Sequence, residues 1–205
     1  MSSTPRPPGN PDQASPDAVL SAAALGDISS LIAALDAGAA IEARDAKGRS
    51  PLLLAVLRDD VSMAQVLLER GADPNAIDDR NDTPWLATGV TGSVAMLETL
   101  LPAGPDLTLR NRYGGVSIIP ASERGHVEYV RRVAQTGIDV NHLNDLRWTA
   151  LLEAVILGDG SPVYQEIVAI LLAAGADPLL ADRDGVTAHE HAVRLGQAAV
   201  AALLP

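Results

Sequence analysis

The sequence contains no cysteine and no phenylalanine, and only five of its 205 residues are aromatic. The absence of cysteine excludes disulfide bonds, cysteine-ligated zinc sites and thiol nucleophiles. Hydrophobic residues still make up 47% of the chain, so a buried core can form, and it must be built mainly from alanine and leucine. Side chains of this kind favour helices that pack closely against one another.

Basic residues are in the minority, and no long run of them occurs. The chain has 15 Lys and Arg against 26 Asp and Glu, which gives a net charge of −11. A chain this acidic is repelled by phosphate backbones and by anionic lipids. We therefore expect neither nucleic acid nor a membrane surface as a partner.

Long apolar runs are also missing, because no stretch reaches the roughly 18 residues that a membrane-spanning helix needs. The first fifteen residues, MSSTPRPPGNPDQAS, contain four prolines and no apolar run. This composition is typical of a disordered tail and not of a signal peptide. We expect a soluble, cytoplasmic protein, and its alanine-rich and arginine-rich composition indicates a GC-rich bacterial source.

A repeat with a period of 33 residues organises the rest of the chain. Two markers follow this period, and both take a final step of 38 residues because five have been inserted near 158–162. The first marker is Ser50-Pro51, Thr83-Pro84, Val116-Ser117, Thr149-Ala150 and Thr187-Ala188, and the second is Gly71-Ala72-Asp73, Gly104-Pro105-Asp106, Gly137-Ile138-Asp139 and Gly175-Ala176-Asp177.

Each marker has a mechanical meaning. A Ser or Thr hydroxyl caps the free N–H groups at a helix start, and Pro fits the first helical turn. Glycine adopts the left-handed conformation that ends a helix. Two short apolar runs lie between the markers, as in LLLAVL (52–57) and VSMAQVLLERG (61–71). Each period therefore predicts two antiparallel helices followed by an extended turn.

The chain resembles the ankyrin repeat family over residues 16–205. The residues that carry the resemblance are GRSPLLLAV (48–56), VLLERGADPNA (66–76), RGHVEYV (124–130), TALLEAV (149–155) and ILLAAGADP (170–178). It implies an all-α solenoid of about six stacked helix–turn–helix units joined by hairpin-like turns, with capping units at both ends. The expected units are 16–44, 45–77, 78–110, 111–143, 144–181 and 182–205, after a tail over 1–15.

Two departures from the pattern lead to specific predictions. In the fourth unit Val116-Ser117 replaces Thr-Pro and Pro120 follows, so the helix should start at or after Ser117, with Ser117 as its cap. In the fifth unit the inserted residues should form a longer loop between the two helices, without a new element. Ser161-Pro162 should then cap and begin the next helix.

The stretch TAHEHA (187–192) raises the question of a metal site or an enzyme. Residues two apart on a helix point about 200° from each other, so His189 and His191 cannot readily hold one ion. His126 is expected to support the neighbouring repeat, and His142 lies in a turn with no visible partner. The aspartates recur once per repeat in turns, where they bond their own backbone. They are Asp73, Asp78, Asp79, Asp82, Asp106, Asp139, Asp145, Asp177, Asp182 and Asp184.

No catalytic residue, metal site or cofactor is therefore expected. The resemblance implies a non-enzymatic, monomeric module that binds a protein partner on its concave face. Two alternatives stay open: a metal-dependent or hydrolytic enzyme using His189, His191 and nearby carboxylates, and a structural accessory scaffold for another enzyme.

Turn tips and exposed inner-helix positions are where the resemblance places partner contacts. Aromatic side chains and arginines often anchor interfaces, which favours a patch around Tyr113 and Trp148. Trp148 could instead fold back over its own helix and shield Leu151. Trp85 and Tyr129 read as structural, and Tyr164 could pack down the inserted loop. The expected partner-binding residues are Arg80, Arg112, Tyr113, Asp145, Leu146, Trp148, Ile156, Leu157, Arg183 and Asp184.

Overall fold

The computed structural model describes residues 16–205, and the expected tail over 1–15 lies outside them. Within that range the chain is helical, apart from turns and one isolated bridge between Ala181 and Thr187. The elements are α1 (Pro16–Leu25), α2 (Ile28–Asp36), α3 (Pro51–Leu57), α4 (Val61–Glu69), α5 (Pro84–Thr91), α6 (Val94–Leu100), η1 (Leu101–Ala103), α7 (Ile118–Glu123), α8 (Val127–Val133), α9 (Ala150–Ile156), α10 (Pro162–Ala173), α11 (Ala188–Arg194) and α12 (Ala198–Ala201).

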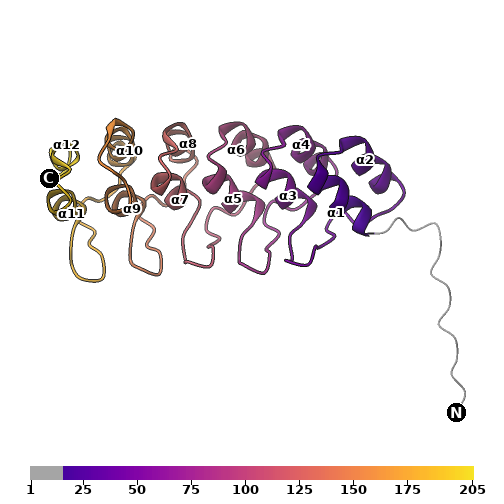
Figure 1. Ribbon diagram of the computed structural model, residues 1–205, viewed down its shortest axis with the longest axis horizontal. Coiled ribbons are helices and arrows are strands. Elements are labelled where there is room, and N and C mark those ends of the chain that lie inside the picture. The colour runs from indigo at the N-terminus through magenta and orange to yellow at the C-terminus, as the bar shows by residue number, and fades with distance from the viewer. Residues whose placement is uncertain (1–15) are drawn as a thin grey trace, which may run out of the picture.

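The helices form two parallel rows, as Figure 1 shows. The odd-numbered helices pack side by side from α1 to α11 and form the inner row. The even-numbered helices lie above them, with α4, α6, α8, α10 and α12 in successive contact. The hairpin-like turns project from the inner row on the opposite side (Figure 1). The all-α solenoid predicted from the sequence is confirmed.

Helix starts in the inner row follow the sequence markers. The hydroxyls of Ser50, Thr83 and Thr149 each accept a hydrogen bond from the N–H three residues later, at 3.0–3.2 Å. In the last repeat Thr187 and Glu190 bond each other's backbone N–H groups in a reciprocal capping box. Each such cap satisfies a backbone donor that the helix itself cannot.

One polar side chain organises each hairpin. Its Oδ1 accepts the backbone N–H groups two and four residues further on, which closes the turn. These side chains are Asp45, Asp78, Asn111, Asn144 and Asp182. A second set, Asp73, Asp106, Asp139 and Asp177, binds the N–H two residues later. The prediction that the repeated aspartates hydrogen-bond the backbone of their own turns is confirmed for the aspartates of these two sets.

Helix α7 begins at Ile118, as predicted, but Ser117 does not cap it. Ser117 has helical backbone angles, with φ −58° and ψ −29°, and its hydroxyl makes no capping hydrogen bond. The backbone here lies against Gly89 of α5, where an added Cβ would come within 2.0 Å of the Ser117 carbonyl oxygen. The start of α7 therefore packs closely on α5 and has no side-chain cap.

The loop before α10 is longer and no new element forms, as predicted, but the five inserted residues are divided between this loop and helix α10. The loop before α10 has five residues (157–161), against three (58–60) before α4, and α10 has 12 residues against nine in α4. Two residues therefore extend the loop and three extend the helix. Pro162 begins α10 as predicted, but Ser161 makes no side-chain cap bond.

Tyr164 packs down the inserted loop, as the sequence suggested. An added Cβ at Gly158 would lie 2.5 Å from the Tyr164 ring, so the glycine lets the ring approach the loop backbone. The Tyr164 hydroxyl donates to the Glu123 carbonyl oxygen at 2.9 Å, which ties α10 to the preceding repeat.

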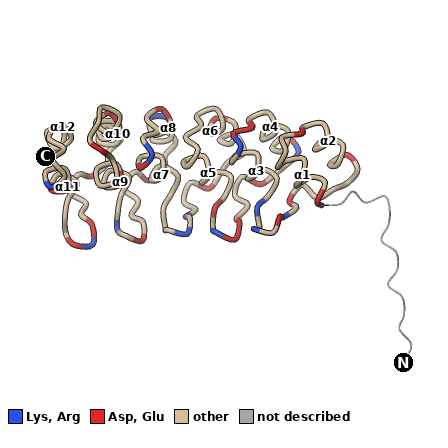
Figure 2. The backbone as a smooth tube through the Cα atoms, in the orientation of Figure 1, with Lys and Arg blue, Asp and Glu red and all other residues tan. Residues whose placement is uncertain are grey.

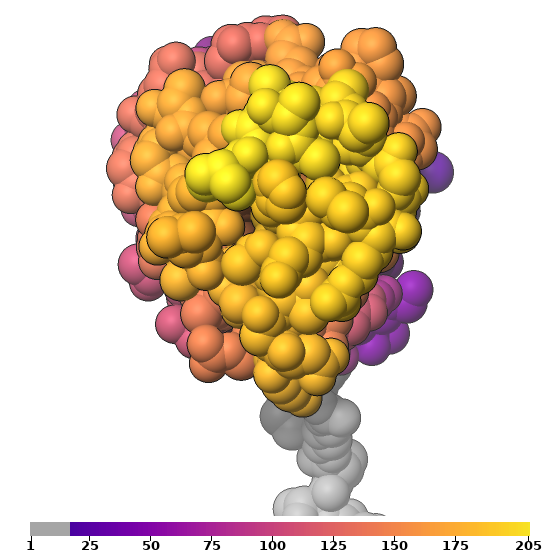
Figure 3. Space-filling model, turned by 90° about the vertical axis from the view of Figure 1, so that its left-hand side faces the viewer, coloured from indigo at the N-terminus to yellow at the C-terminus, as the bar shows by residue number. Residues whose placement is uncertain are grey.

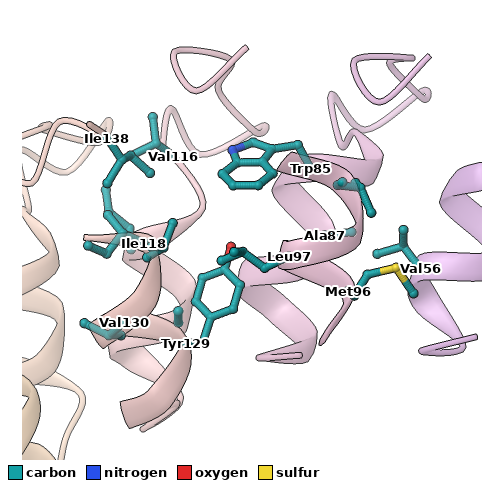
Figure 4. Close-up of a cluster of buried hydrophobic side chains, with 14 of the residues drawn as sticks. Val56, Trp85, Ala87, Met96, Leu97, Val116, Ile118, Tyr129, Val130 and Ile138 are labelled. Atoms are coloured by element: carbon teal, nitrogen blue, oxygen red, sulfur yellow. The ribbon is translucent and has the colours of Figure 1, made fainter. Parts of the chain in front are cut away.

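Two large aromatic side chains fill the middle of the core (Figure 4). Trp85 on α5 and Tyr129 on α8 are both fully buried, which confirms their structural role. The Thr88 hydroxyl donates to the Trp85 carbonyl at 2.7 Å and lies 2.6 Å from the Tyr129 hydroxyl, so Tyr129 donates to Thr88. Burial raises the pKa of Tyr129 to about 12.

The last repeat covers the C-terminal end of the stack, as the end-on view in Figure 3 shows. Gln197 ties it to the repeat before, because its Nε2 donates to the carbonyl oxygens of Val155 and Gly158, at 3.0 Å each. Val193 and Leu195 on this repeat are more than half exposed.

Candidate binding groove

A groove of about 630 Å³ runs between the hairpins and the inner helices of the middle repeats. The hairpins contribute side chains such as Arg80, Tyr113 and Asp145 to its lining. Helices α5, α7 and α9 contribute Val90, Glu123 and Glu153. The groove thus lies on the hairpin side of the inner row, where α5, α7 and α9 are neighbours (Figure 1).

Half of the expected partner-binding residues line this groove, and half do not. Arg80, Arg112, Tyr113, Asp145 and Leu146 line it, whereas Trp148, Ile156, Leu157, Arg183 and Asp184 lie outside its lining.

The five expected residues outside the groove lining lie in different surroundings. Trp148 and Ile156 are half-buried and pack against the core, which is the alternative that the sequence left open for Trp148. Leu157 is half exposed beyond the end of α9. Arg183 donates to the Asp145 carbonyl oxygen at 2.7 Å and links the last two hairpins. Tyr113 and Trp148 therefore do not form one exposed aromatic patch.

Tyr113 lines the groove and is in contact with its neighbour Arg112. Its side chain is 59% exposed. The Arg112 guanidinium lies 4.3 Å from the ring centroid and donates to the Tyr113 hydroxyl at 2.7 Å. Arg112 also reaches Asp82 in the preceding hairpin, at 3.7 Å. An exposed aromatic ring whose position is already fixed loses little conformational freedom when a partner covers it.

Acidic and basic residues both occur along the hairpin tips, as the colours of the tube in Figure 2 show. Neighbouring tips also bond through their backbones, since the Asp79 N–H donates to the Lys47 carbonyl and the Asp145 N–H to that of Tyr113. Burial and the nearby Asp78 raise the pKa of Asp82 above its ordinary value, against the opposing charge of Arg112. A mixed surface of this kind favours a partner with mixed charges over a polyanion.

Glu153 is the groove residue that the sequence interpretation missed. It lies on α9 and is only 6% exposed. Burial, followed by the charge of Glu123, raises its pKa to about 7. The repeat register contained a signal, because the equivalent positions 33, 66 and 99 residues earlier hold Pro120, Ala87 and Leu54. A glutamate where three repeats have an apolar residue could have been singled out.

The histidines of TAHEHA point to different partners. His189 Nδ1 lies 3.3 Å from the Leu204 carbonyl oxygen, and His191 Nε2 lies 2.8 Å from Asp182 Oδ2. The pKa of Asp182 is lowered chiefly by the N–H of Val186 and also by His191. Within residues 16–205 no group of three or more His, Asp or Glu side chains is arranged to hold a metal ion.

The other two histidines connect neighbouring repeats. His126 Nε2 lies 3.2 Å from the Val90 carbonyl oxygen, which confirms the expected supporting role. His142 Nε2 lies 2.7 Å from the Gly114 carbonyl oxygen. The expectation that His142 has no partner is therefore wrong, because its partner comes from a hairpin 28 residues earlier, which the local sequence does not reveal.

The helices of residues 16–205 are too short to cross a membrane, and none combines the necessary length with the necessary hydropathy.

Two rows of helices with projecting hairpins and a lateral groove define this protein as an α-solenoid repeat protein. The chain belongs to the ankyrin repeat family. The family model for three ankyrin repeats matches residues 85–182, and the single-repeat model matches residues 47–79. Ankyrin repeats are generally protein–protein interaction modules.

Solved bacterial structures and a curated relative support this assignment. An ankyrin repeat domain from Acinetobacter baumannii is 46% identical, with a TM-score of 0.86, over 90% of this chain and 94% of that one. The ankyrin repeat protein EF0377 is 36% identical, with a TM-score of 0.88, over 92% and 96%. The ankyrin repeat protein YahD of Escherichia coli is 45% identical over 100 residues, which are 48% of this chain and only half the length of YahD.

Proposed function

We propose that this chain is a non-enzymatic binding module that holds a segment of a protein partner in the groove around Tyr113. The observation that carries the proposal is the exposed Tyr113 ring, held by Arg112, in the lining of a groove of about 630 Å³. Tyrosine and arginine are among the side chains that most often dominate binding energy. Arg80, Arg112, Asp145 and Leu146 line the same groove and complete the proposed contact surface.

The remaining expected contacts form an extension of this proposal toward the last repeat. Leu157, Arg183 and Asp184 would be reached by a partner longer than the groove, whereas Trp148 and Ile156 would support the surface from the core side. We further propose that the protein acts as a cytoplasmic monomer. Light scattering of the purified protein and fractionation of the source cells test these two points.

Site-specific photo-crosslinking tests the binding face. A photoreactive phenylalanine derivative at position 113 should crosslink to a protein in native lysate, whereas the same residue at Glu69, exposed on the outer helix α4, should not. The variant Tyr113→Ala/Leu146→Ala should reduce capture of that protein at least tenfold. Leu179→Ala/Leu203→Ala, which also removes two exposed apolar side chains but away from the groove, should leave capture unchanged. Equal capture by both variants would refute the proposed site.

A further inference from the structure

Glu153 is a buried residue whose two carboxylate oxygens differ. One accepts a hydrogen bond from Asn144, and the other has no hydrogen-bond partner among the described residues. Its Oε1 accepts from Asn144 Nδ2 at 2.9 Å. The Asn144 Oδ1 already accepts the N–H groups of Leu146 and Trp148, so the amide can only turn its NH₂ toward Glu153. Glu153 Oε2 has no hydrogen-bond partner among the described residues, although the side chain is more than nine-tenths buried and lines the groove.

A second carboxylate adds to the negative charge at this place. Glu123, at the end of α7, lines the same groove, and its charge interacts with that of Glu153. No ion pair within residues 16–205 includes either side chain. By contrast, Asp82 in the same groove has Arg112 as a partner. The free protein thus holds two neighbouring carboxylates without an ion-pair partner, and burial together with the charge of Glu123 disfavours the charged form of Glu153.

The fold itself does not require an acid at position 153. The equivalent residues of three earlier repeats are Leu54, Ala87 and Pro120, and all three are buried without a charge. A buried charge lowers stability unless it is paired, so an apolar residue would serve the solenoid at least as well. Glu153 gains one hydrogen bond from Asn144 but introduces a buried charge without an ion-pair partner, and a role in binding would account for this cost.

We propose that Glu123 and Glu153 form a socket for a lysine or arginine side chain of the protein partner. The inference rests on the proposed function and specifies the chemistry of the partner. The cationic head would lie between the two carboxylates and bond the free Oε2 of Glu153. The aliphatic stem would cross the apolar part of the groove, where Tyr113 and Leu146 are more than half exposed. The net charge of −11 attracts a basic segment from a distance.

A nuclear magnetic resonance titration of the intact protein tests the socket directly. The probes are Nα-acetyl-lysine amide and Nα-acetyl-arginine amide, with Nα-acetyl-norleucine amide as the uncharged control. We expect saturable shifts of the backbone amides of α7 and α9 at millimolar concentrations of both cationic probes, and at least fivefold weaker binding of the norleucine compound. Equal binding of all three probes, or shifts confined to other helices, would overturn the proposal.

Three charge variants test whether Glu153 binds a cation or only supports the structure. Glu153→Gln keeps an acceptor for Asn144 Nδ2 and removes only the charge, so it should fold normally and weaken the cationic probes at least fivefold. Glu69→Gln makes the same change in net charge on the outer face and should not alter the affinity. Arg124→Gln removes an exposed cation from the groove lining and should strengthen binding about twofold. An affinity that Glu153→Gln leaves unchanged would refute the socket.

Failure of this inference can be told apart from failure of the proposed function. If Tyr113→Ala/Leu146→Ala loses the captured protein while Glu153→Gln retains it in full, the groove binds a partner but not through a cation, and the socket is rejected. If neither variant loses the protein, the binding face itself is wrong. Loss in both variants, together with the probe titration, supports the socket.

Discussion

The fifth repeat (144–181) and the sixth repeat (182–205) each have a hydrogen bond between inner helix and hairpin at equivalent positions, but with different residue types. In repeat five, Glu153 on α9 accepts from Asn144 of the hairpin at 2.9 Å. In repeat six, His191 on α11 lies 2.8 Å from Asp182 of the hairpin. Both pairs are nine residues apart and differ by the same step of 38 residues. The acid is on the helix in one repeat and on the turn in the other.

The comparison separates what the fold needs from what it does not. Both arrangements supply a hydrogen bond between the hairpin and its helix, but the fold does not need one, because the equivalent residues of three earlier repeats are Leu54, Ala87 and Pro120. Repeat six gives its carboxylate a histidine partner and two backbone N–H donors. In repeat five, Glu153 lines the groove and has no ion-pair partner among the described residues. A buried carboxylate without an ion-pair partner therefore occurs in the groove that Tyr113 also lines. It is not a general feature of the repeat.

The largest expected effect comes from removing the hairpin residue of either pair. Asn144→Ala deletes three hydrogen bonds in a buried setting and leaves Glu153 without its donor, so the free energy of unfolding should fall by about 3 kcal/mol. Asp182→Ala removes comparable bonds at the end of the stack, where a repeat has only one neighbour. Its effect should be smaller, about 2 kcal/mol, and confined to the last repeat.

Urea denaturation with hydrogen exchange distinguishes these outcomes. Asn144→Ala should lower amide protection in repeats on both sides of the hairpin, whereas Asp182→Ala should lower it only within 182–205. Equal loss of protection throughout the chain in both variants would mean that the end repeat is as firmly coupled as the middle, contrary to this account.

The next effect concerns the charge of Glu153 and depends on pH. Burial and the neighbouring Glu123 raise the folded-state pKa to about 7 from an ordinary value of 4.5. Between these values the folded protein holds a proton that the unfolded chain releases, so stability falls as the pH rises and the loss is complete above pH 7. Glu153→Gln should match the wild type near pH 4.5 and exceed its free energy of unfolding by about 2–3 kcal/mol at pH 8.

The difference between wild type and variant is the quantity to measure, because many other carboxylates titrate over the same range. Denaturant titrations at several pH values provide it, with Glu69→Gln on the outer face as the matched control. A difference for Glu153→Gln that did not grow between pH 4.5 and 8 would show that Glu153 is already well solvated or paired.

The repeat architecture could be predicted because its markers are local. Thr83, Thr149 and Thr187 act as caps through a bond three residues away, and a spacing in the sequence expresses this directly. The groove chemistry could not be predicted in the same way. Trp148 turned toward the core, His142 found a carbonyl in the preceding hairpin, and the burial of Glu153 depends on how α7 and α9 pack. These features depend on how neighbouring repeats pack against each other, and a spacing within the sequence does not give those distances.

The smallest expected effect concerns the left-handed residue of the two hairpins. Arg147 has φ +61°, whereas the equivalent residue of repeat six is Gly185, with φ +77°. A side chain in this conformation costs about 1 kcal/mol, and glycine gives back roughly half of that through its greater freedom in the unfolded chain. Arg147→Gly should therefore raise the free energy of unfolding by about 0.5 kcal/mol, and Gly185→Arg should lower it by a similar amount.

Gly114 sharpens this test, because its hairpin adds a steric cost to the conformational one. An added Cβ there would lie 2.4 Å from Asp145 Oδ1, whereas nothing lies within 4 Å of one at Gly185. Gly114→Ala should therefore destabilise the protein by about 2 kcal/mol, clearly more than Gly185→Ala. Thermal unfolding of the four variants under one buffer condition gives the ranking. If Arg147→Gly proved less stable than the wild type, the Arg147 side chain would contribute contacts that outweigh its backbone strain, and repeat five would differ from repeat six in a further respect.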